Sequence, residues 1–273
     1  MTTQKQGSEQ DWVPEGVDTS RPSIARCYDW YLGGRHNFAV DREVGEQVLA
    51  VEPSSALNAR ANRAFLQRAV RHLAVERGLR RFVDLGTGIP TAGNVHEVLA
   101  ECAPEARVLY VDHDPVAVAH SRALLRGSGT ATVVQADFRS PRAVLDHPFL
   151  KEAVAAGEPV GVLMVAVLHC ITDEEDPWGI VAEFRDALPP GSAFAISHAT
   201  EDGLTSEQAR RIEDLYRNSA SPLTLRGRAE VERLFAGCEL VEPGVAMVTD
   251  WRPAASDAPA PDTVFVWCGV GVH

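Results

Sequence analysis

The feature that most constrains the fold is a regular alternation between short apolar segments and amphipathic helical patterns after residue 79. The helical stretches between the apolar segments are long enough to cross over a sheet, and such crossovers produce parallel strands with helices on both faces. The chain of 273 residues is long enough for one sizeable core of this kind. The expected strands are Arg81 to Leu85, Arg107 to Val111, Thr132 to Gln135, Val160 to Leu168 and Ser192 to Ser197.

The regions on either side of this alternation have different patterns. Residues 1–20 are polar with little to bury, which predicts a flexible tail. Residues 21–78 predict a helical extension with a break at Gly33-Gly34 and a helix capped by Asp41. Residues 79–273 form the main domain. Its last part holds two strand-like segments, near 245–248 and 264–270, joined by a loop rich in proline and alanine from 252 to 262, which predicts an antiparallel hairpin at the edge of the sheet.

Charge and cysteine content exclude several classes of protein. The chain carries 38 acidic and 26 basic residues, a net charge of -12 that repels nucleic acid. Its five cysteines form no Cys-x-x-Cys pair, so we expect no metal site and a reducing compartment. The first 20 residues lack the pattern of a secretory signal, and the longest apolar run, 160–168, is too short to span a bilayer. These features favour a cytoplasmic protein without a membrane partner.

Glycines and aspartates occur where the first three strands are expected to end. Gly86 and Gly88 follow the first strand, where missing side chains let backbone N–H groups approach a ligand. Asp84, Asp112 and Asp137 close the first, second and third strands. In a parallel sheet these ends meet at the edge where ligands bind. Taken singly, each aspartate is equally well explained as a loop or capping residue.

Three carboxylates at neighbouring strand ends suit a nucleoside that carries an amino-acid tail. Asp112 would accept hydrogen bonds from both ribose hydroxyls, and Asp137, beside Phe138, would accept one from the exocyclic amino group of adenine. Asp84 would organise the glycine loop and bind the ammonium of the tail.

The motifs resemble those of class I S-adenosylmethionine-dependent methyltransferases. They are Asp84-Leu85-Gly86-Thr87-Gly88, Tyr110-Val111-Asp112-His113-Asp114-Pro115, Gln135-Ala136-Asp137-Phe138-Arg139 and Val165-Ala166-Val167-Leu168-His169. Together with Arg21-Pro22-Ser23-Ile24-Ala25-Arg26 and Tyr31-Leu32-Gly33-Gly34, nearly the whole chain is similar to a bacterial family named S-adenosyl methyltransferase, formerly a domain of unknown function. The resemblance implies a Rossmann-like α/β fold with a seven-stranded, mostly parallel sheet and an antiparallel C-terminal strand.

The same resemblance implies S-adenosyl-L-methionine as cofactor and S-adenosyl-L-homocysteine as product. The residues expected to bind the cofactor are Asp84, Gly86, Thr87, Gly88, Asp112, His113, Asp137, Phe138, Ala166 and Tyr31. Tyr31 belongs to an aromatic group with Tyr28, Trp30 and Phe38. Additions before the first strand commonly cover the site in this fold, so the extension is expected to cover the cofactor; ordinary helix packing is the alternative use of these rings.

His169 is the candidate catalytic residue, because a base must take the proton of a hydroxyl or amine acceptor. In plant-type O-methyltransferases the histidine of a similar Leu-His-Asp-Trp segment is the base, whereas here Cys170 and Ile171 follow the histidine. A buried histidine that only packs is the alternative. His198, at the end of the fifth strand, is a second histidine at this rim for which packing is favoured.

A small-molecule acceptor is favoured because no Asn-Pro-Pro-Tyr type segment follows the fourth strand. Two other functions compete with a methyltransferase. A non-catalytic S-adenosylmethionine-binding protein would keep every cofactor residue. A nicotinamide-dependent oxidoreductase would share Gly86 and Gly88, but Thr91 replaces the third glycine of its fingerprint, and Asp112 lies 26 positions after Gly86, where roughly 20 is usual. The sequence does not indicate an oligomeric state.

Overall fold

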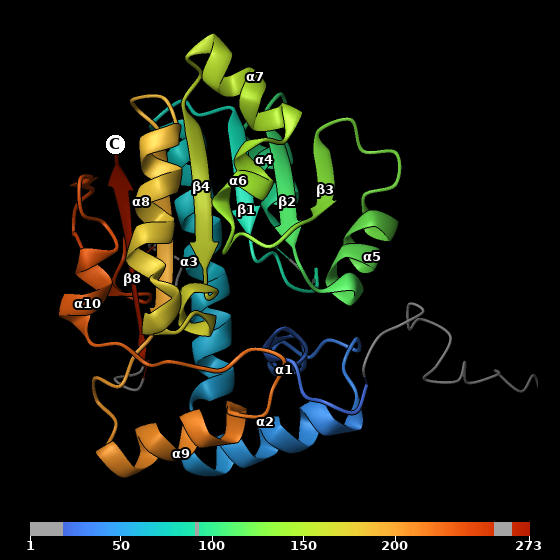
Figure 1. Ribbon diagram of the computed structural model, residues 1–273, viewed down its shortest axis with the longest axis vertical. Coiled ribbons are helices and arrows are strands. Elements are labelled where there is room, and N and C mark those ends of the chain that lie inside the picture. Colours follow the sequence, from blue (N-terminus) through green and yellow to red (C-terminus); the bar gives the residue numbers. More distant parts are fainter. Residues whose placement is uncertain (1–18, 91–92, 254–263) are drawn as a thin grey trace, which may run out of the picture.

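The computed structural model describes residues 19–90, 93–253 and 264–273, and its centre is one mixed sheet (Figure 1). The strand order is β3-β2-β1-β4-β5-β8-β6, and β7 also pairs with β8. The first five strands are parallel, as predicted, because a helical crossover follows each of the first four. They are β1 (Arg81–Leu85), β2 (Arg107–Asp112), β3 (Ala131–Gln135), β4 (Val160–Val165) and β5 (Ala193–Ala199).

The C-terminal strands complete the sheet in the antiparallel direction. β8 (Val266–Val272) runs antiparallel to β5 over seven residue pairs, so it lies inside the sheet. The expected hairpin partner, β7 (Ala246–Met247), pairs with the other side of β8, and so does the two-residue β6 (Glu239–Leu240). The sheet therefore has eight strands instead of the expected seven, because a two-residue strand leaves no alternating pattern in the sequence. Residues 254–262 of the predicted connecting loop lie outside the described residues.

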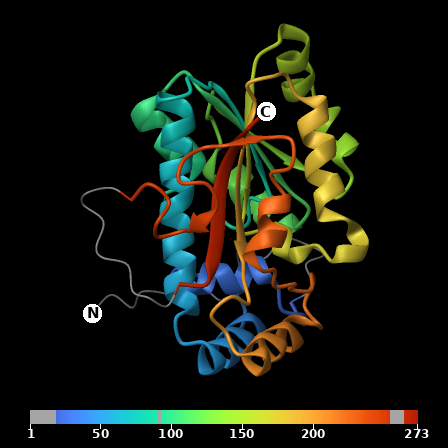
Figure 2. The same ribbon diagram turned by 90° about the vertical axis from the view of Figure 1, so that its left-hand side faces the viewer.

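Helices cover both faces of the sheet (Figure 2). Side chains alternate across β1, so that Phe82 packs into the cluster on one face and Val83 into the cluster on the other. On the first face lie α3 (Ser55–Val75) and α4 (Val95–Cys102). On the second lie α6 (Pro141–Leu145), α7 (Pro148–Ala156), α8 (Pro177–Ala187) and α10 (Arg228–Arg233). The remaining short elements are α5 (Pro115–Leu124) and the 3₁₀ turns η1 (Leu168–Cys170) and η2 (Asp173–Glu175).

A helical cap lies below the carboxyl ends of the parallel strands in Figure 1. It is formed by α1 (Ile24–Tyr31), α2 (Ala39–Val51) and α9 (Ser206–Tyr216), and α2 packs beside α9. Their shared core holds Cys27, Val48, Ile212 and Tyr216, all buried. The predicted N-terminal extension is therefore only part of the cap, since its other helix comes from the chain between β5 and β8. Residues 1–18 of the predicted tail lie outside the described residues.

A buried carboxylate fixes the relation between α1 and α2. Asp41 accepts hydrogen bonds from the backbone N–H groups of Ser23 and Phe38, each at 2.8 Å, and pairs with Nε of Arg26 at 2.8 Å. The predicted helix does form, but it begins at Ala39, so Asp41 is its third residue and not its cap. Within the described ranges, no helix is long and apolar enough to cross a membrane.

Candidate active site

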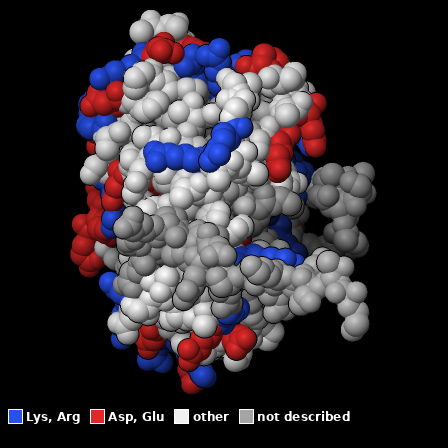
Figure 3. Space-filling view, turned by 90° about the vertical axis from the view of Figure 1, so that its right-hand side faces the viewer, with Lys and Arg blue, Asp and Glu red and all other residues white. Residues whose placement is uncertain are grey.

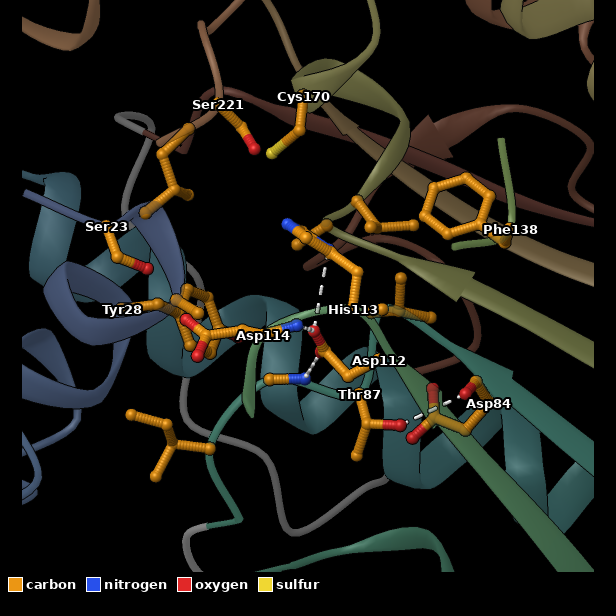
Figure 4. Close-up of a pocket in the computed structure, with 18 of the residues that line it drawn as sticks. Ser23, Tyr28, Asp84, Thr87, Asp112, His113, Asp114, Phe138, Cys170 and Ser221 are labelled. Atoms are coloured by element: carbon orange, nitrogen blue, oxygen red, sulfur yellow. Dashed lines mark hydrogen bonds and ion pairs between the residues drawn. The ribbon is translucent and has the colours of Figure 1, made fainter. Parts of the chain in front are cut away.

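Nine of the ten predicted cofactor residues line one cavity at the carboxyl ends of β1, β2 and β4; Tyr31 does not line it. In Figure 4, Asp112, Thr87 and Asp84 lie along one side of the cavity, and Cys170 and Ser221 along the other. Ser23 and Tyr28 contribute from the N-terminal part of the cap, while Ala220 and Ser221 follow α9. Both parts of the cap therefore contribute to the wall of the cavity.

The glycine loop after β1 is held against the end of β2. The backbone N–H groups of Gly86 and Thr87 donate to the Val111 carbonyl at 2.9 and 3.2 Å. Gly86 has a φ of +69°, and a Cβ at this position would collide with Cγ2 of Val167. Only glycine satisfies both constraints, because its backbone adopts positive φ freely and brings no side chain. The loop thus turns closely enough to place Gly88 and Ile89 in the wall of the cavity.

Asp112 joins this loop to the turn after β2. Its side chain is buried, with 7% of the residue exposed; Oδ2 accepts the N–H of Gly88 at 2.7 Å, and Oδ1 accepts that of Asp114 at 2.8 Å. Burial raises the pKa of Asp112, which these two hydrogen bonds oppose. An ionised carboxylate accepts about four hydrogen bonds, two at each oxygen. Each oxygen of Asp112 can therefore accept one more hydrogen bond, from a ligand in the cavity. His113, half exposed, lies with Nδ1 at 3.7 Å from Oδ1 of Asp112.

Asp84 is a buried carboxyl group that has no partner among the described residues. No hydrogen bond or ion pair within the described parts of the chain reaches its carboxyl oxygens, although the residue is only 7% exposed and lines the cavity. Burial raises the pKa of Asp84 to about 7, and Arg63 acts in the opposite direction. Arg63 comes from α3, lines the same cavity and lies over the Tyr28 ring at 5.7 Å. Its buried Nε has no hydrogen-bond partner among the described residues.

Asp137 and Phe138 follow β3 and line the same cavity. Asp137 is partly exposed, and Nη2 of Arg139 pairs with its Oδ2 at 2.6 Å. Arg139 also reaches Oε1 of Glu175 in η2 at 3.0 Å. Phe138 is buried and presents an apolar surface to the cavity. The predicted polar and aromatic pair is therefore present, with the carboxylate held in place by an arginine.

A family described as S-adenosyl methyltransferase matches residues 10–273. The chain belongs to this family. Two solved structures resemble it over nearly their whole length: a candidate methyltransferase from Thermobifida fusca and a DUF574 family protein from Streptomyces avermitilis. The first is 37% identical with a TM-score of 0.87, covering 96% of this chain and 98% of the other. The second is 37% identical with a TM-score of 0.86, covering 93% of this chain and 98% of the other.

The N-methyltransferase NodS from Bradyrhizobium japonicum shares the fold, with 10% identity, a TM-score of 0.50, and coverage of 80% of this chain and 98% of the other. No curated protein matches the sequence. The chain is thus an S-adenosylmethionine-dependent methyltransferase with a class I fold. The cavity fits this cofactor, because the unpartnered Asp84 carboxyl and the unpartnered Nε of Arg63 complement the opposite charges of its amino-acid end.

A second cavity of the methyltransferase adjoins the first, and Ile24, Tyr28, Asn62 and Ala166 line both. A chain of hydrogen bonds fixes this shared wall. The Ala166 N–H donates to Ser197 Oγ at 2.9 Å, and Ser197 Oγ donates to Asn62 Oδ1 at 2.5 Å. Asn62 Nδ2 then donates to Tyr28 Oη at 3.0 Å. Ala166 itself has a φ of +56°, a left-handed conformation that is uncommon outside glycine.

Tyr31 is a predicted cofactor residue that the structure places elsewhere. Its ring lines the second cavity, and its hydroxyl lies 3.3 Å from Tyr216 Oη and 3.4 Å from the Gly45 carbonyl. The aromatic group is thereby divided: Tyr28 lines both cavities, whereas Trp30 packs beside Gly45 within the cap.

His169 lines the second cavity, but its geometry argues against the predicted role of general base. Its Nδ1 accepts the Ala199 N–H at 3.3 Å, which places the proton of the neutral ring on Nε2. Burial, with Arg226 contributing, lowers the pKa of His169 to about 4. The lone pair of the neutral ring is then on Nδ1, where the Ala199 N–H already occupies it, and Nε2 can only donate a hydrogen bond to an acceptor molecule. We therefore favour a positioning role for His169.

His198 has a structural role, as expected. Its Nε2 lies 2.9 Å from Nη1 of the buried Arg226, and its Nδ1 lies 2.7 Å from the Ala199 carbonyl. Arg226 also donates to the carbonyls of Leu168 and Ile171, and thus fixes the segment that carries His169.

We expect nitrogen NMR of the histidine-labelled methyltransferase to show His169 as the Nε2–H tautomer without titration between pH 5 and 8. The low pKa, which comes mainly from burial, keeps the ring neutral throughout that range. His169→Gln, which loses this signal, supplies the assignment. A ring that titrates near its ordinary pKa, with the proton of the neutral form on Nδ1, would restore the general-base role.

Neither thiol nor metal chemistry is indicated by the described residues. All five cysteines are free. Cys170 lines the first cavity, but burial raises the pKa of its thiol to about 12, so the thiol is neutral near pH 7. Among the residues that the structure describes, no group of histidine, cysteine and acidic side chains is arranged to hold a metal ion.

Proposed function

We propose that this methyltransferase is a bacterial, cytoplasmic enzyme that methylates a small-molecule acceptor. The observation that carries the proposal is the pair of adjoining cavities with one shared wall, which suits a cofactor on one side and an acceptor on the other. The surface charge supports it. On the face in Figure 3, lysine and arginine side chains of the described residues lie scattered, without the basic patch that nucleic acid requires.

Each part of the first cavity has a proposed task in holding the cofactor. Asp112 accepts hydrogen bonds from the ribose hydroxyls, while Asp137 and Phe138 receive the adenine. Asp84 pairs with the ammonium and Arg63 with the carboxylate of the amino-acid end. Sequence patterns gave no reason to select Arg63, because arginines recur along α3 and most such residues face solvent.

S-adenosylmethionine supplies an activated methyl group on a sulfonium; when it transfers, the S–CH₃ bond breaks as the bond to the acceptor forms, and the electron pair stays on sulfur. Alignment provides much of the rate enhancement for such an in-line transfer. The shared wall at Ala166 and Tyr28 performs the alignment, because hydrogen bonds join the turn after β4 to β5, α3 and α1. The Nε2–H of His169 orients the acceptor, and the acceptor's proton leaves to water.

The first experiment combines a binding test with a search for product. We expect S-adenosylhomocysteine at 100 times its dissociation constant to stabilise the protein by about 2.7 kcal/mol in thermal unfolding, whereas NADH has no effect. Cofactor with a labelled methyl group is then incubated with extract of Streptomyces avermitilis, which has a 37% identical relative. The label should appear in the ultrafiltrate. Label confined to retained macromolecules would contradict the proposal, and no transfer at all would favour a non-catalytic binding protein.

A further inference from the structure

The second cavity is open to solvent and has a volume of about 780 Å³, its open mouth included, between the cap and the ends of β4 and β5. Its apolar lining comes mainly from Tyr31, Leu204, Ile212, Tyr216, Leu223 and Phe265. These residues come from α1, α9, the segments just before and after α9, and the chain just before β8. A ligand there would be surrounded by aliphatic and aromatic side chains and would contact the shared wall. What this cavity binds depends on the proposed function and extends it.

The described residues that line the second cavity include an acidic side chain and no basic one. No lysine or arginine is among the described residues that line the cavity, and its single acidic residue is Glu52. The imidazole of His169 is neutral near pH 7, because burial lowers its pKa to about 4. The hydroxyl groups of Tyr31 and Tyr216 are likewise uncharged, because burial raises their pKa values. Among the described lining residues, Glu52 is therefore the only one with a carboxylate.

Glu52 is 9% exposed, and only one of its two carboxyl oxygens accepts a hydrogen bond from the described residues. Its Oε1 accepts the N–H of Ser54 at 3.0 Å and the hydroxyl of Ser54 at 2.7 Å. Across the described residues, no hydrogen bond involves Oε2 and no cation pairs with the group. Glu52 is also the C-terminal cap of α2, where the partial negative charge of the helix end adds to its own. A buried negative charge at a helix C-terminus favours a cationic partner over a neutral or anionic one.

We propose that the second cavity binds a largely apolar acceptor that carries a protonated amine, and that this amine pairs with Glu52. The apolar body fills the space between the cap helices, and the acceptor atom that receives the methyl group lies at the shared wall. Acceptors with a carboxylate or phosphate are excluded, because the cavity offers such a group no cation and places it near Glu52.

The test compares amines with carboxylates of the same shape. Protein saturated with S-adenosylhomocysteine is titrated calorimetrically with phenethylamine, tryptamine and octylamine, and with 3-phenylpropionate, indole-3-propionate and nonanoate. We expect at least one amine to bind about tenfold or more tightly than its carboxylate counterpart, the factor that one charge-assisted hydrogen bond readily provides. If no amine binds more tightly than its counterpart, the proposal is overturned.

Two variants locate the charge. Glu52→Gln keeps an oxygen for the hydrogen bonds of Ser54 and removes only the charge, so we expect it to abolish the preference for amines. Glu46→Gln, an exposed position on α2, should leave the preference intact. An undiminished preference in Glu52→Gln would contradict the assignment. Binding of S-adenosylhomocysteine is measured on the same samples: its loss in the wild type would refute the proposed cofactor site, whereas its presence without amine preference refutes only the acceptor class.

Discussion

Replacing Asp112 by alanine is expected to weaken S-adenosylhomocysteine binding about a hundredfold or more. The wild-type carboxylate would accept hydrogen bonds from two ribose hydroxyls, and bonds to a charged group contribute roughly 1.5–3 kcal/mol each. The same substitution removes the acceptors for Gly88 and Asp114, so the glycine loop also loses its connection to the turn after β2. Both effects reduce affinity, and neither reaches the second cavity.

Calorimetric titration with S-adenosylhomocysteine measures this loss, and thermal unfolding of the unliganded variant shows that the protein still folds. Asp114→Asn is the matched control. It removes a carboxylate two residues away, but asparagine caps a helix as well as aspartate does, so α5 keeps its N-cap. Its affinity should change less than severalfold. An Asp112→Ala variant that binds as tightly as the wild type would remove Asp112 from the cofactor site.

Asp84→Asn is expected to stabilise the unliganded protein at pH 8 while weakening cofactor binding. In the folded protein the pKa of Asp84 is about 7, compared with an ordinary value of 3.8. Between these values the folded state holds a proton that the unfolded state has released, so the free energy of unfolding falls as pH rises from about 4 to 7. Asparagine carries no charge and avoids this cost.

The same carboxyl makes binding depend on pH. Below pH 7 Asp84 is protonated and loses the charge that would attract the ammonium, so the affinity of the wild type should fall about tenfold between pH 8 and pH 6. Asp112 is the other acid lining the cavity whose pKa burial raises. Comparison with Asp84→Asn therefore isolates the contribution of Asp84.

Calorimetry at the two pH values, with thermal unfolding of the unliganded proteins, tests both effects of Asp84. In Asp84→Asn the affinity should be lower at pH 8 and nearly independent of pH. Asp137→Asn is a useful comparison, because Asp137 is partly exposed and already paired with Arg139. It should not stabilise the protein. Equal affinity of the wild type at pH 6 and pH 8, or a less stable Asp84→Asn at pH 8, would contradict this account.

The sequence predicted the parallel strands and the placing of the three aspartates at one cavity, because both depend on regular rules. Carboxyl ends of parallel strands meet at one edge, so Asp84, Asp112 and Asp137 had to lie near one another once their strands were placed. Gly86 lies where positive φ and a close neighbour require glycine. Such features follow from local pattern and topology alone.

Features that depend on how the helices are oriented in the folded protein were not predicted. Tyr28 and Tyr31 are one turn apart on α1, yet only Tyr28 reaches the first cavity, because the tilt of the helix over the sheet decides which rings enter. Arg63 has the same local pattern as the other arginines of α3. The packing of α2 against α9 is likewise a contact between distant segments, which a local pattern does not reveal.

The division of the cap between two distant segments also has a consequence for the order in which the protein folds during synthesis. The glycine loop, all three aspartates and the first five strands precede α9 in the chain. While the chain is emerging, α1 and α2 have no partner for the apolar surface around Cys27 and Val48, because Ile212 and Tyr216 come much later. Domains fold largely in the direction of synthesis. We therefore expect the nucleotide cavity to close late, so that the ability to retain the cofactor is acquired only near the end of translation.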